Sequence, residues 1–387
     1  MNPAIACWLG LTAHRANCPS HGQVGLLFCH EEPTVTTTKI DEAKLNELLM
    51  KVVGDMGAAF STSLVVLGNR LGLYKALAEA PATSAELASR TETTERYVRE
   101  WLNNQAAGGY VQYDPENARY WMTAEQAAAF ADSTSPAFMP GAFEVASAMV
   151  HAEPRIRESF KTGEGLPWGE QHTCLFGGTE SFFRANYIGN LIHNWIPALE
   201  GVQAKLEAGC KVADVGCGHG ASTILMAEAF PKSTFIGFDY HPDSVATATE
   251  RAAERGLSDR VRFEVADATS FPGEDYGFVT HFDCFHDLGN PAGAAGRVRE
   301  ALAPDGTWMV VEPFANDRTE DNHNPVGRVF YGASTMLCVP CSLALDGPAL
   351  GAQAGEKRLG EFMHGAGFTR VRRATETPFN IVLEIGH

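Results

Sequence analysis

Lys and Arg are scarce in this sequence relative to the acidic residues. The 387 residues include 30 Lys and Arg against 47 Asp and Glu, which gives a formal net charge of −17 at pH 7. Proteins that bind nucleic acids or anionic membranes need clustered cations, because these displace counterions from phosphates. The charge therefore argues against nucleic acid and membrane as partners, and it leaves small-molecule chemistry open.

An unbroken apolar run of membrane-spanning length is also missing. Such a helix needs about 18 apolar residues, and the longest candidate segment, Ala4–Ala13, is shorter. No Lys or Arg precedes this segment and no convincing cleavage site follows it, so it resembles a signal peptide poorly. We therefore expect a cytoplasmic protein.

Cysteine forms no obvious disulfide framework. The nine cysteines are odd in number and scattered, which fits reduced thiols better than disulfides. Residues 1–38 hold Cys and His at spacings that match no zinc module, so we expect no metal site there. This segment has little periodicity, and we interpret it as a disordered leader or as the product of a start codon assigned too early. Its Cys and His residues are Cys7, His14, Cys18, His21, Cys29 and His30.

Residues 39–130 carry the pattern of a winged helix-turn-helix domain. Two capping boxes, Thr83 with Glu86 and Thr123 with Gln126, each predict the start of a helix. Apolar residues recur at helical spacing before the first box. Between the boxes, an amphipathic helix is followed by YVQYDPENARYWMT, which predicts a β-hairpin.

This order of elements raises the question of DNA binding. The second helix of the motif would be residues 94–107, whose charged residues are balanced in sign. Across residues 39–130 there are 9 Lys and Arg against 12 Asp and Glu, a net charge of −3, whereas a domain that reads DNA should be basic. We therefore favour a role in dimerisation and in forming the substrate pocket.

Residues 131–205 form an aromatic-rich connector. Several Gly and Pro residues predict that it is broken into short helices and loops. Most aromatic side chains belong to cores, but some of these could also wall an apolar ligand pocket between domains. They are Phe138, Phe143, Trp168, Phe176, Phe182, Phe183, Tyr187 and Trp195.

Strand and helix patterns alternate over residues 206–387. The first five strand patterns predict a mostly parallel α/β sheet with helices on both faces, and the last two predict an antiparallel finish. An insertion at about residues 314–358 interrupts this order and could lie over the site as a lid. The strand patterns are KVADVG, TFIGFD, VRFEVAD, GFVTHFDC, TWMVVEP, RVRRAT and FNIVLEI.

A glycine-rich turn follows the first of these strands. Ligands of open α/β sheets bind beyond the carboxyl ends of the strands, so this turn is the candidate ligand site. No Lys follows Gly220, which argues against a P-loop, and the third glycine comes one place too early for the dinucleotide pattern G-x-G-x-x-G. The motif Asp214-Val-Gly216-Cys-Gly218-His-Gly220 resembles instead D/E-x-G-x-G-x-G of class I S-adenosylmethionine-dependent methyltransferases.

Acids at the ends of the next two strands strengthen this resemblance. Asp239 ends the second strand pattern, where its carboxylate can accept hydrogen bonds from both ribose hydroxyls, and Asp267 ends the third, where the family places an acid for the adenine amino group. The resemblance implies S-adenosyl-L-methionine as cofactor and S-adenosyl-L-homocysteine as product. It implies contacts to the cofactor from Asp214, Gly216, Cys217, Gly218, Gly220, Asp239, Tyr240, Asp267, Ala268 and Phe282.

The resemblance extends over about residues 39–387. The chain is similar to two-domain methyltransferases of actinobacteria that are often labelled transcriptional regulators, and more distantly to winged-helix small-molecule O-methyltransferases of plant phenolic and bacterial polyketide pathways. This similarity implies a Rossmann-like methyltransferase sheet behind an N-terminal winged-helix domain. It also implies a homodimer built through the winged-helix domain.

The candidate base lies in the pattern FDCFHDLGNP. His286-Asp287 falls where winged-helix O-methyltransferases carry a His-Asp pair whose histidine is the base, and Glu312 matches an acid that orients this histidine. Imidazole suits the role because its pKa lies near neutrality. Leu288 stands where the family has an aromatic residue, which leaves an alternative in which His286 bonds within a loop and Asp287 caps a helix. We expect no redox or metal role for the CxxC pair of residues 338–341.

Together these patterns predict an S-adenosylmethionine-dependent methyltransferase that O-methylates an apolar or aromatic small molecule. Two alternatives stay open. The chain could be a ligand-sensing transcriptional regulator that retains a cofactor-binding domain and binds DNA through residues 94–107. It could also methylate carbon or nitrogen, which would need no base of this kind.

Overall fold

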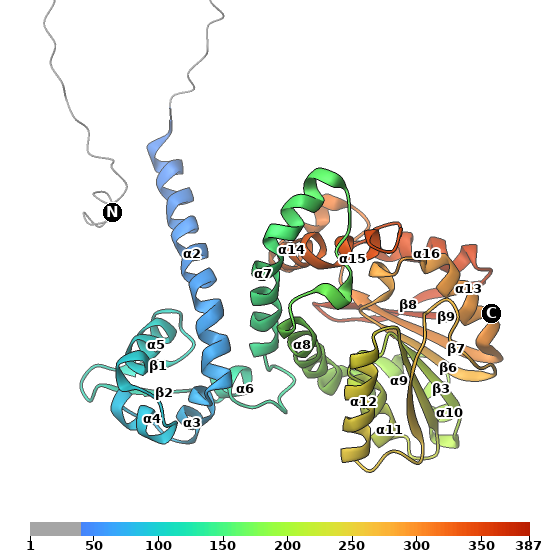
Figure 1. The fold of residues 1–387 in the computed structure, drawn as a ribbon, viewed down its shortest axis with the longest axis horizontal. Coiled ribbons are helices and arrows are strands. Elements are labelled where there is room, and N and C mark those ends of the chain that lie inside the picture. Colours follow the sequence, from blue (N-terminus) through green and yellow to red (C-terminus); the bar gives the residue numbers. More distant parts are fainter. Residues whose placement is uncertain (1–39) are drawn as a thin grey trace, which may run out of the picture. The chain divides into compact units, whose positions relative to one another are not determined.

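The computed structural model describes residues 40–387 (Figure 1). The expectations for residues 1–38, including the candidate zinc ligands and the poor signal peptide, lie outside this range. Within the described range, no group of three or more His, Cys, Asp and Glu side chains is placed to hold a metal ion. The described residues belong to two units, residues 40–51 and residues 52–387.

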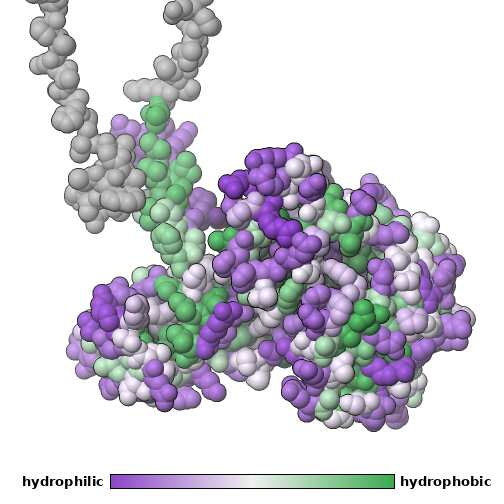
Figure 2. Space-filling model, in the orientation of Figure 1, coloured by the Kyte–Doolittle hydropathy of each residue, from purple (hydrophilic) through white to green (hydrophobic). Residues whose placement is uncertain are grey.

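The first described helix, α2 (Glu42–Arg70), is a single element of 29 residues. By length and composition alone it could cross a membrane, with 17% of the relevant window buried, and one such helix is weak support for a span. The expectation that no apolar stretch approaches this length was therefore wrong, because Val, Leu, Met, Phe and Ala keep the mean hydropathy of this helix high even though Gly and Ser interrupt the apolar run. Figure 2 shows hydrophobic residues along α2. Its exposed large apolar residues are Leu48, Met50, Val52, Val53, Met56, Phe60 and Leu67.

The helices and hairpin of a winged helix-turn-helix follow α2. Both capping boxes are confirmed: Thr83 and Glu86 each accept the other's backbone N–H with a side-chain oxygen, and Thr123 and Gln126 do the same. The core of this part centres on the ring of Tyr74, which stands edge-on to that of Trp101. The elements are α3 (Leu73–Glu79), α4 (Ser84–Arg90), α5 (Glu95–Ala107), β1 (Gln112–Asp114), β2 (Arg119–Trp121) and α6 (Ala124–Phe130).

The connector contains two long helices, so the expected short helices and loops were wrong. A Cβ on Gly141 would lie 2.7 Å from the carbonyl oxygen of Gly178, and a Cβ on Gly178 would lie 2.8 Å from Cβ of Glu144. These glycines bring the backbones of α7 and α8 together, and Pro154 lies inside α7 without ending it. The elements are α7 (Pro140–Thr162), η1 (Trp168–Glu170), α8 (Cys174–Asn190), η2 (Leu191–Trp195), α9 (Ile196–Ala198) and α10 (Val202–Ala208).

A seven-stranded sheet has the order β5-β4-β3-β6-β7-β9-β8. Neighbours from β5 to β7 are parallel, and β9 runs antiparallel to both β7 and β8, which confirms the predicted sheet. The strand order reverses between β3 and β6, which is the switch point where open α/β sheets bind ligands. The strands are β3 (Lys211–Val215), β4 (Thr234–Asp239), β5 (Val261–Val265), β6 (Tyr276–Phe282), β7 (Leu302–Pro313), β8 (Arg370–Glu376) and β9 (Asn380–Gly386).

Two hydrophobic clusters fill the two faces of this sheet. Successive residues of β3 alternate between them: Val212 belongs to the first cluster and Ala213 to the second. The first cluster contains residues of α11 and α12, together with Trp195 of the connector, and the second contains residues of α13 and α16. These helices are α11 (Ala221–Ala229), α12 (Pro242–Glu254), α13 (Pro291–Ala301) and α16 (Gly355–Gly365).

The insertion between β7 and α16 packs on the turn that follows β6. Helix α15 contacts that turn, η3 (Phe285–Asp287), and Ser342 Oγ donates a hydrogen bond to the carbonyl oxygen of Leu288 at 2.9 Å. The insertion therefore packs beside the turn that carries His286, and its role as a lid stays a prediction. Its elements are η4 (Thr319–Asn322), α14 (Pro325–Ala333), η5 (Ser334–Cys338) and α15 (Val339–Leu343).

Candidate functional site

The glycine loop between β3 and α11 has a left-handed backbone at each glycine. Gly216, Gly218 and Gly220 have φ values of 76°, 51° and 77°, which residues with a Cβ rarely adopt. A Cβ on Gly216 would lie 2.6 Å from Cys284 Sγ, and a Cβ on Gly220 would lie 2.6 Å from the ring of Phe263. A Cβ on Gly218 would meet nothing within 4 Å. Two glycines thus allow close packing, and the third borders open space.

Asp214 is buried beneath this loop. Its Oδ2 accepts hydrogen bonds from Ser222 Oγ at 2.6 Å and Thr223 Oγ1 at 2.5 Å, and its Oδ1 accepts one from Thr280 Oγ1 at 2.9 Å. Burial raises the pKa of Asp214, and the three hydroxyl donors act in the opposite direction. The carboxylate therefore braces β3, α11 and β6 behind the loop, and its contribution to ligand binding would be indirect.

Asp239, at the end of β4, connects the loop to the neighbouring strand. Its Oδ2 accepts the backbone N–H of Gly218 and its Oδ1 accepts that of His241, each at 2.9 Å. A carboxylate oxygen can accept a second hydrogen bond, so each retains capacity for a ligand. Burial raises the pKa of Asp239, while the two backbone donors lower it.

The remaining candidate cofactor residues divide between the edge of the sheet and the core. Asp267 is exposed beyond β5, where its Oδ1 accepts hydrogen bonds from the backbone N–H and the hydroxyl of Thr269. Tyr240 is 46% exposed, and Ala268 is half-buried against the second cluster. Cys217 and Phe282 are buried. The side chain of Phe282 packs in the first hydrophobic cluster. Only the backbone of Phe282 therefore lies at the carboxyl end of β6, where the ligand site is expected.

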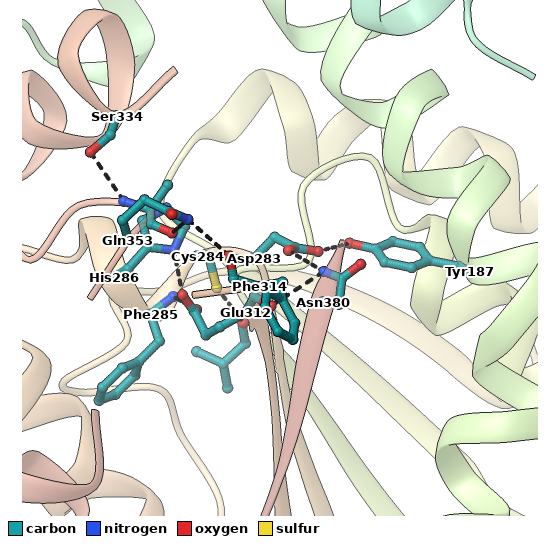
Figure 3. A network of polar contacts seen from close by, with 12 residues as sticks. Tyr187, Asp283, Cys284, Phe285, His286, Glu312, Phe314, Ser334, Gln353 and Asn380 are labelled. Carbon is teal, nitrogen blue, oxygen red and sulfur yellow. Dashed lines mark hydrogen bonds and ion pairs between the residues drawn. The ribbon is translucent and has the colours of Figure 1, made fainter. Parts of the chain in front are cut away.

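The turn after β6 carries His286 into the interior against Glu312. His286 Nδ1 lies 2.5 Å from Glu312 Oε2, and Glu312 Oε1 accepts the backbone N–H of Phe285 at 2.9 Å (Figure 3). Only 4% and 2% of the His286 and Glu312 side chains are exposed. One carboxylate therefore orients both the imidazole and the turn that carries it, and the thiol of Cys338 also hydrogen-bonds the ring.

The pKa of His286 is set by two opposing effects. Burial lowers it, while the charge of Glu312 and the thiol of Cys338 raise it, and the result lies well above the usual value for histidine. The ring therefore binds a proton more tightly than a free imidazole does.

The other ionisable groups around this pair are acidic. Burial raises the pKa of Asp287 to about 7, and burial together with Glu312 raises that of Asp283. Within residues 40–387, no Lys or Arg is among the charged groups that most strongly affect His286, Asp283 or Asp287. Apart from His286, the turn after β6 therefore offers no cationic side chain that would attract an anionic ligand.

The connector and the insertion cover this edge with apolar side chains. The ring of Phe176 on α8 lies 5.0 Å from that of His241, and the ring of Trp168 lies 5.4 Å from that of Phe176. Trp168 packs with Leu337 and Cys341 of the insertion. The CxxC pair is thus part of an apolar cover, and both of its thiols are free and buried.

The structure adds three residues that the sequence pattern did not single out for this site. Asn380 Nδ2 donates to Asp283 Oδ1 at 2.8 Å, and the hydroxyl of Tyr187 donates to Asp283 Oδ2 at 3.4 Å. Figure 3 shows these side chains in one network with His286 and Glu312. Asp283 lies within the FDCFHD pattern, so an acid three residues before the candidate base was the available signal.

Two stretches of the chain match known domain families. Residues 206–362 match the family described as a methyltransferase domain, and residues 59–131 match the Rv2258c-like winged HTH domain. Together with the seven-stranded sheet, these matches confirm the predicted fold. The chain carries a Rossmann-like class I methyltransferase domain behind an N-terminal winged helix-turn-helix domain.

Individual relatives cover the chain to different extents. A mitomycin biosynthesis 6-O-methyltransferase of Streptomyces lavendulae is 22% identical over 352 residues, which are 89% of this chain and 93% of that protein. A demethylmenaquinone methyltransferase of Thermus thermophilus is 33% identical over 104 residues, and the chain spans 46% of its length. Human N-acetylserotonin methyltransferase in complex with SAM is similar in structure, with a TM-score of 0.67 and 15% identity over 91% of this chain and 100% of that one. At this identity the structural likeness shows the fold alone.

The different surroundings of two glycines predict different effects of substitution. Gly220→Ala should lower the free energy of unfolding by roughly 1–3 kcal/mol, because a left-handed backbone is strained and the Cβ meets Phe263. Gly218→Ala should destabilise less and should weaken ligand binding more, because its Cβ enters open space. Denaturant unfolding and calorimetry with S-adenosylhomocysteine measure the two effects. Equal losses of stability and of affinity in both variants would contradict this assignment.

Proposed function

We propose that this chain, through the methyltransferase domain at residues 206–362, transfers the methyl group of S-adenosylmethionine to a hydroxyl group of an apolar or aromatic small molecule. The observation that carries the proposal is the buried pair of His286 and Glu312 beside the glycine loop. The proximity is direct, since Cys284 of the same turn lies against Gly216. The similarity to a 6-O-methyltransferase over most of both chains supports oxygen as the methylated atom.

The residues at the switch point fit this cofactor. S-adenosylmethionine supplies a methyl group bound to a positively charged sulfur. Gly218 borders open space, and each oxygen of Asp239 can accept one ribose hydroxyl. Asp267 lies further along the same edge for the adenine amino group. A cofactor without phosphate needs no lysine in the loop.

His286 would act as the base. Because Nδ1 is bound to Glu312, Nε2 is the atom that would take the hydroxyl proton, and Glu312 would stabilise the imidazolium that forms. Below the pKa of His286 the ring already holds a proton and cannot accept another. Turnover should therefore increase as the pH rises through that pKa, which Glu312 holds above its usual range.

The cover of the site supports a neutral, apolar acceptor. Trp168 and Phe176 bring aromatic rings to the edge, and rings of this kind line sites for flat apolar ligands. In the described part of the chain, no Lys or Arg is among the charged groups that most strongly affect His286, Asp283 and Asp287, so none of these would bind a carboxylate or phosphate on the acceptor. A phenolic or polyketide-like hydroxyl compound meets both conditions.

The two alternatives have less support. A DNA-binding regulator agrees with the winged HTH match, but Arg96 and Arg99 on α5 pair with Glu100 and Glu95 of the same helix and leave no basic face there. Such a regulator would have to show salt-dependent DNA binding. Methylation at carbon or nitrogen needs no base of this kind, so it would not explain the buried His286–Glu312 pair.

We also propose that the chain forms a homodimer through its winged-helix part, at residues 39–130, and acts in the cytoplasm. The row of exposed apolar side chains on α2, which ends at Leu67, is a surface that a second copy would cover. The described cysteines are free, as is usual in a reducing compartment.

Removing the ribose contact tests the cofactor. Asp239→Ala should weaken the binding of S-adenosylhomocysteine at least tenfold, because hydrogen bonds to a carboxylate contribute about 1.5–3 kcal/mol each. Isothermal titration calorimetry measures this affinity. Asp243→Ala, an exposed acid in the first turn of α12, is the matched control and should bind normally. Unchanged affinity in Asp239→Ala would rule out the proposed ribose contact.

Removing the base tests the reaction. His286→Asn should lower turnover roughly 10²-fold or more and should remove the increase of kcat with pH, while affinity for S-adenosylhomocysteine is kept. Turnover is measured with whichever phenol of an acceptor panel the wild type methylates. His193→Asn, at an exposed histidine of η2, is the control. A wild-type kcat in His286→Asn would show that this histidine is a structural residue and not the base.

Breaking the apolar row on α2 tests the dimer. Phe60 is 67% exposed, and Phe60→Asp should convert a dimer into a monomer, because the carboxylate would be buried at the interface. Light scattering after size exclusion gives the mass. Val150→Asp places the same charge on an exposed apolar residue of α7 and should stay dimeric. A monomeric wild type, or a Phe60→Asp dimer of unchanged strength, would refute the interface.

A further inference from the structure

The side chain of Gln353 lies in the loop between α15 and α16 and is bound at the end of β7. Its Nε2 donates hydrogen bonds to the backbone carbonyl oxygens of Phe314 and Ala352, each at 2.9 Å. Carbonyl oxygens can only accept hydrogen bonds, so the nitrogen of the amide must face them and Oε1 must face away. Two backbone groups therefore fix the orientation of this side chain.

The amide oxygen of Gln353 is left without a donor. Oε1 is buried, and no residue in the range 40–387 donates a hydrogen bond to it. Buried acceptors in native proteins are nearly always paired, because an unpaired one loses its hydrogen bonds to water and gains none in return. A ligand that brings a hydrogen-bond donor to this atom would satisfy it.

Two sets of contacts join Gln353 to the surroundings of the candidate base. Phe314, which accepts one of its hydrogen bonds, directly follows β7, the strand that carries the partner of the base. Ala352, which accepts the other, packs in one cluster with Cys338, whose thiol hydrogen-bonds the ring of His286. Figure 3 shows Gln353 in the same network as His286. The unpaired oxygen therefore belongs to the same edge of the sheet as the base.

The order of the strands indicates which ligand Gln353 would meet. The glycine loop follows β3, the turn that carries His286 follows β6, and Gln353 is bound at the end of β7. Because β6 lies between β3 and β7 in the sheet, the turn with the base separates Gln353 from the loop proposed for the cofactor. An acceptor molecule with its reacting hydroxyl at His286 can therefore extend toward Gln353, away from the cofactor.

We propose that Gln353 is a specificity-determining residue: its Oε1 accepts a hydrogen bond from a second donor group of the acceptor molecule, a hydroxyl or N–H beyond the oxygen that is methylated. The inference rests on the proposed function, because it concerns the acceptor of that reaction. A site with such an oxygen discriminates against a compound that lacks the donor, because that compound would leave the oxygen buried and unpaired. The preferred acceptors are thus flat aromatic compounds with at least two donor groups, rather than simple phenols.

The test compares flat phenols that carry one or two hydroxyl groups. Naphthols have one hydroxyl, and dihydroxynaphthalenes add a second at different positions of the same ring system. Isothermal titration calorimetry of the full chain, saturated with S-adenosylhomocysteine, measures their affinities. Wild type should bind at least one dihydroxynaphthalene roughly tenfold more tightly than the matching naphthol, which is the effect of about one hydrogen bond. Gln353→Leu should abolish this advantage and leave the affinity for the naphthol within about twofold of wild type.

Two further variants separate this role from a structural one. Gln203→Leu, at an exposed glutamine of α10, is the matched control and should keep the advantage. Gln353→Asn draws the amide back by one methylene, and it should also reduce the advantage if Gln353→Leu does not fold.

The outcomes distinguish this inference from the proposed function. Equal affinities in wild type, no binding of any of these compounds, or an advantage that survives in the Gln353 variants would overturn the inference. Methyl transfer to these compounds without the preference would leave the proposed function standing. The preference without methyl transfer to any of them would count against the proposed function alone.

Discussion

The arrangement of the site depends on the carboxylate of Glu312. One of its oxygens accepts the backbone N–H of Phe285 and the other holds the ring of His286, so a single group sets both the turn and the imidazole. All three partners are buried. Loss of the carboxylate would leave a buried backbone donor and a buried ring nitrogen unsatisfied, and each such group costs about 1–3 kcal/mol. The pairing of β6 with β7 up to Phe282 and Val311 brings Glu312 beside the turn that follows β6.

The parts of this site that the sequence predicted are those fixed by topology and by local chemistry. Parallel strands bring their carboxyl ends to one edge, so a glycine turn after β3 and an acid after β4 meet without any knowledge of packing. The pairing of His286 with Glu312 was implied by the family resemblance, and the adjacent strands β6 and β7 bring the two residues together. The capping boxes at Thr83 and Thr123 were predictable because their hydrogen bonds lie within four residues.

The parts that the sequence did not predict depend on contacts between distant segments. Asn380 lies 97 residues from Asp283 and 194 residues from Asn186, so no spacing pattern links them. Gly141 looks like a helix breaker in the sequence, and only the neighbouring helix shows that it permits close packing. Asp214 matches a cofactor motif, but its carboxylate oxygens already accept hydrogen bonds from hydroxyl groups. One of these hydroxyls, that of Thr280, comes from the distant strand β6. In each case the deciding partner comes from another segment of the fold.

The position of Asp239 beside the glycine loop has a consequence for a catalytic cycle. Under the proposed function, the cofactor enters as a sulfonium ion and leaves as an uncharged thioether. The ribose is the same in both forms, so a contact from Asp239 would hold the spent product as well as the donor. The product would therefore compete with fresh donor for the same loop.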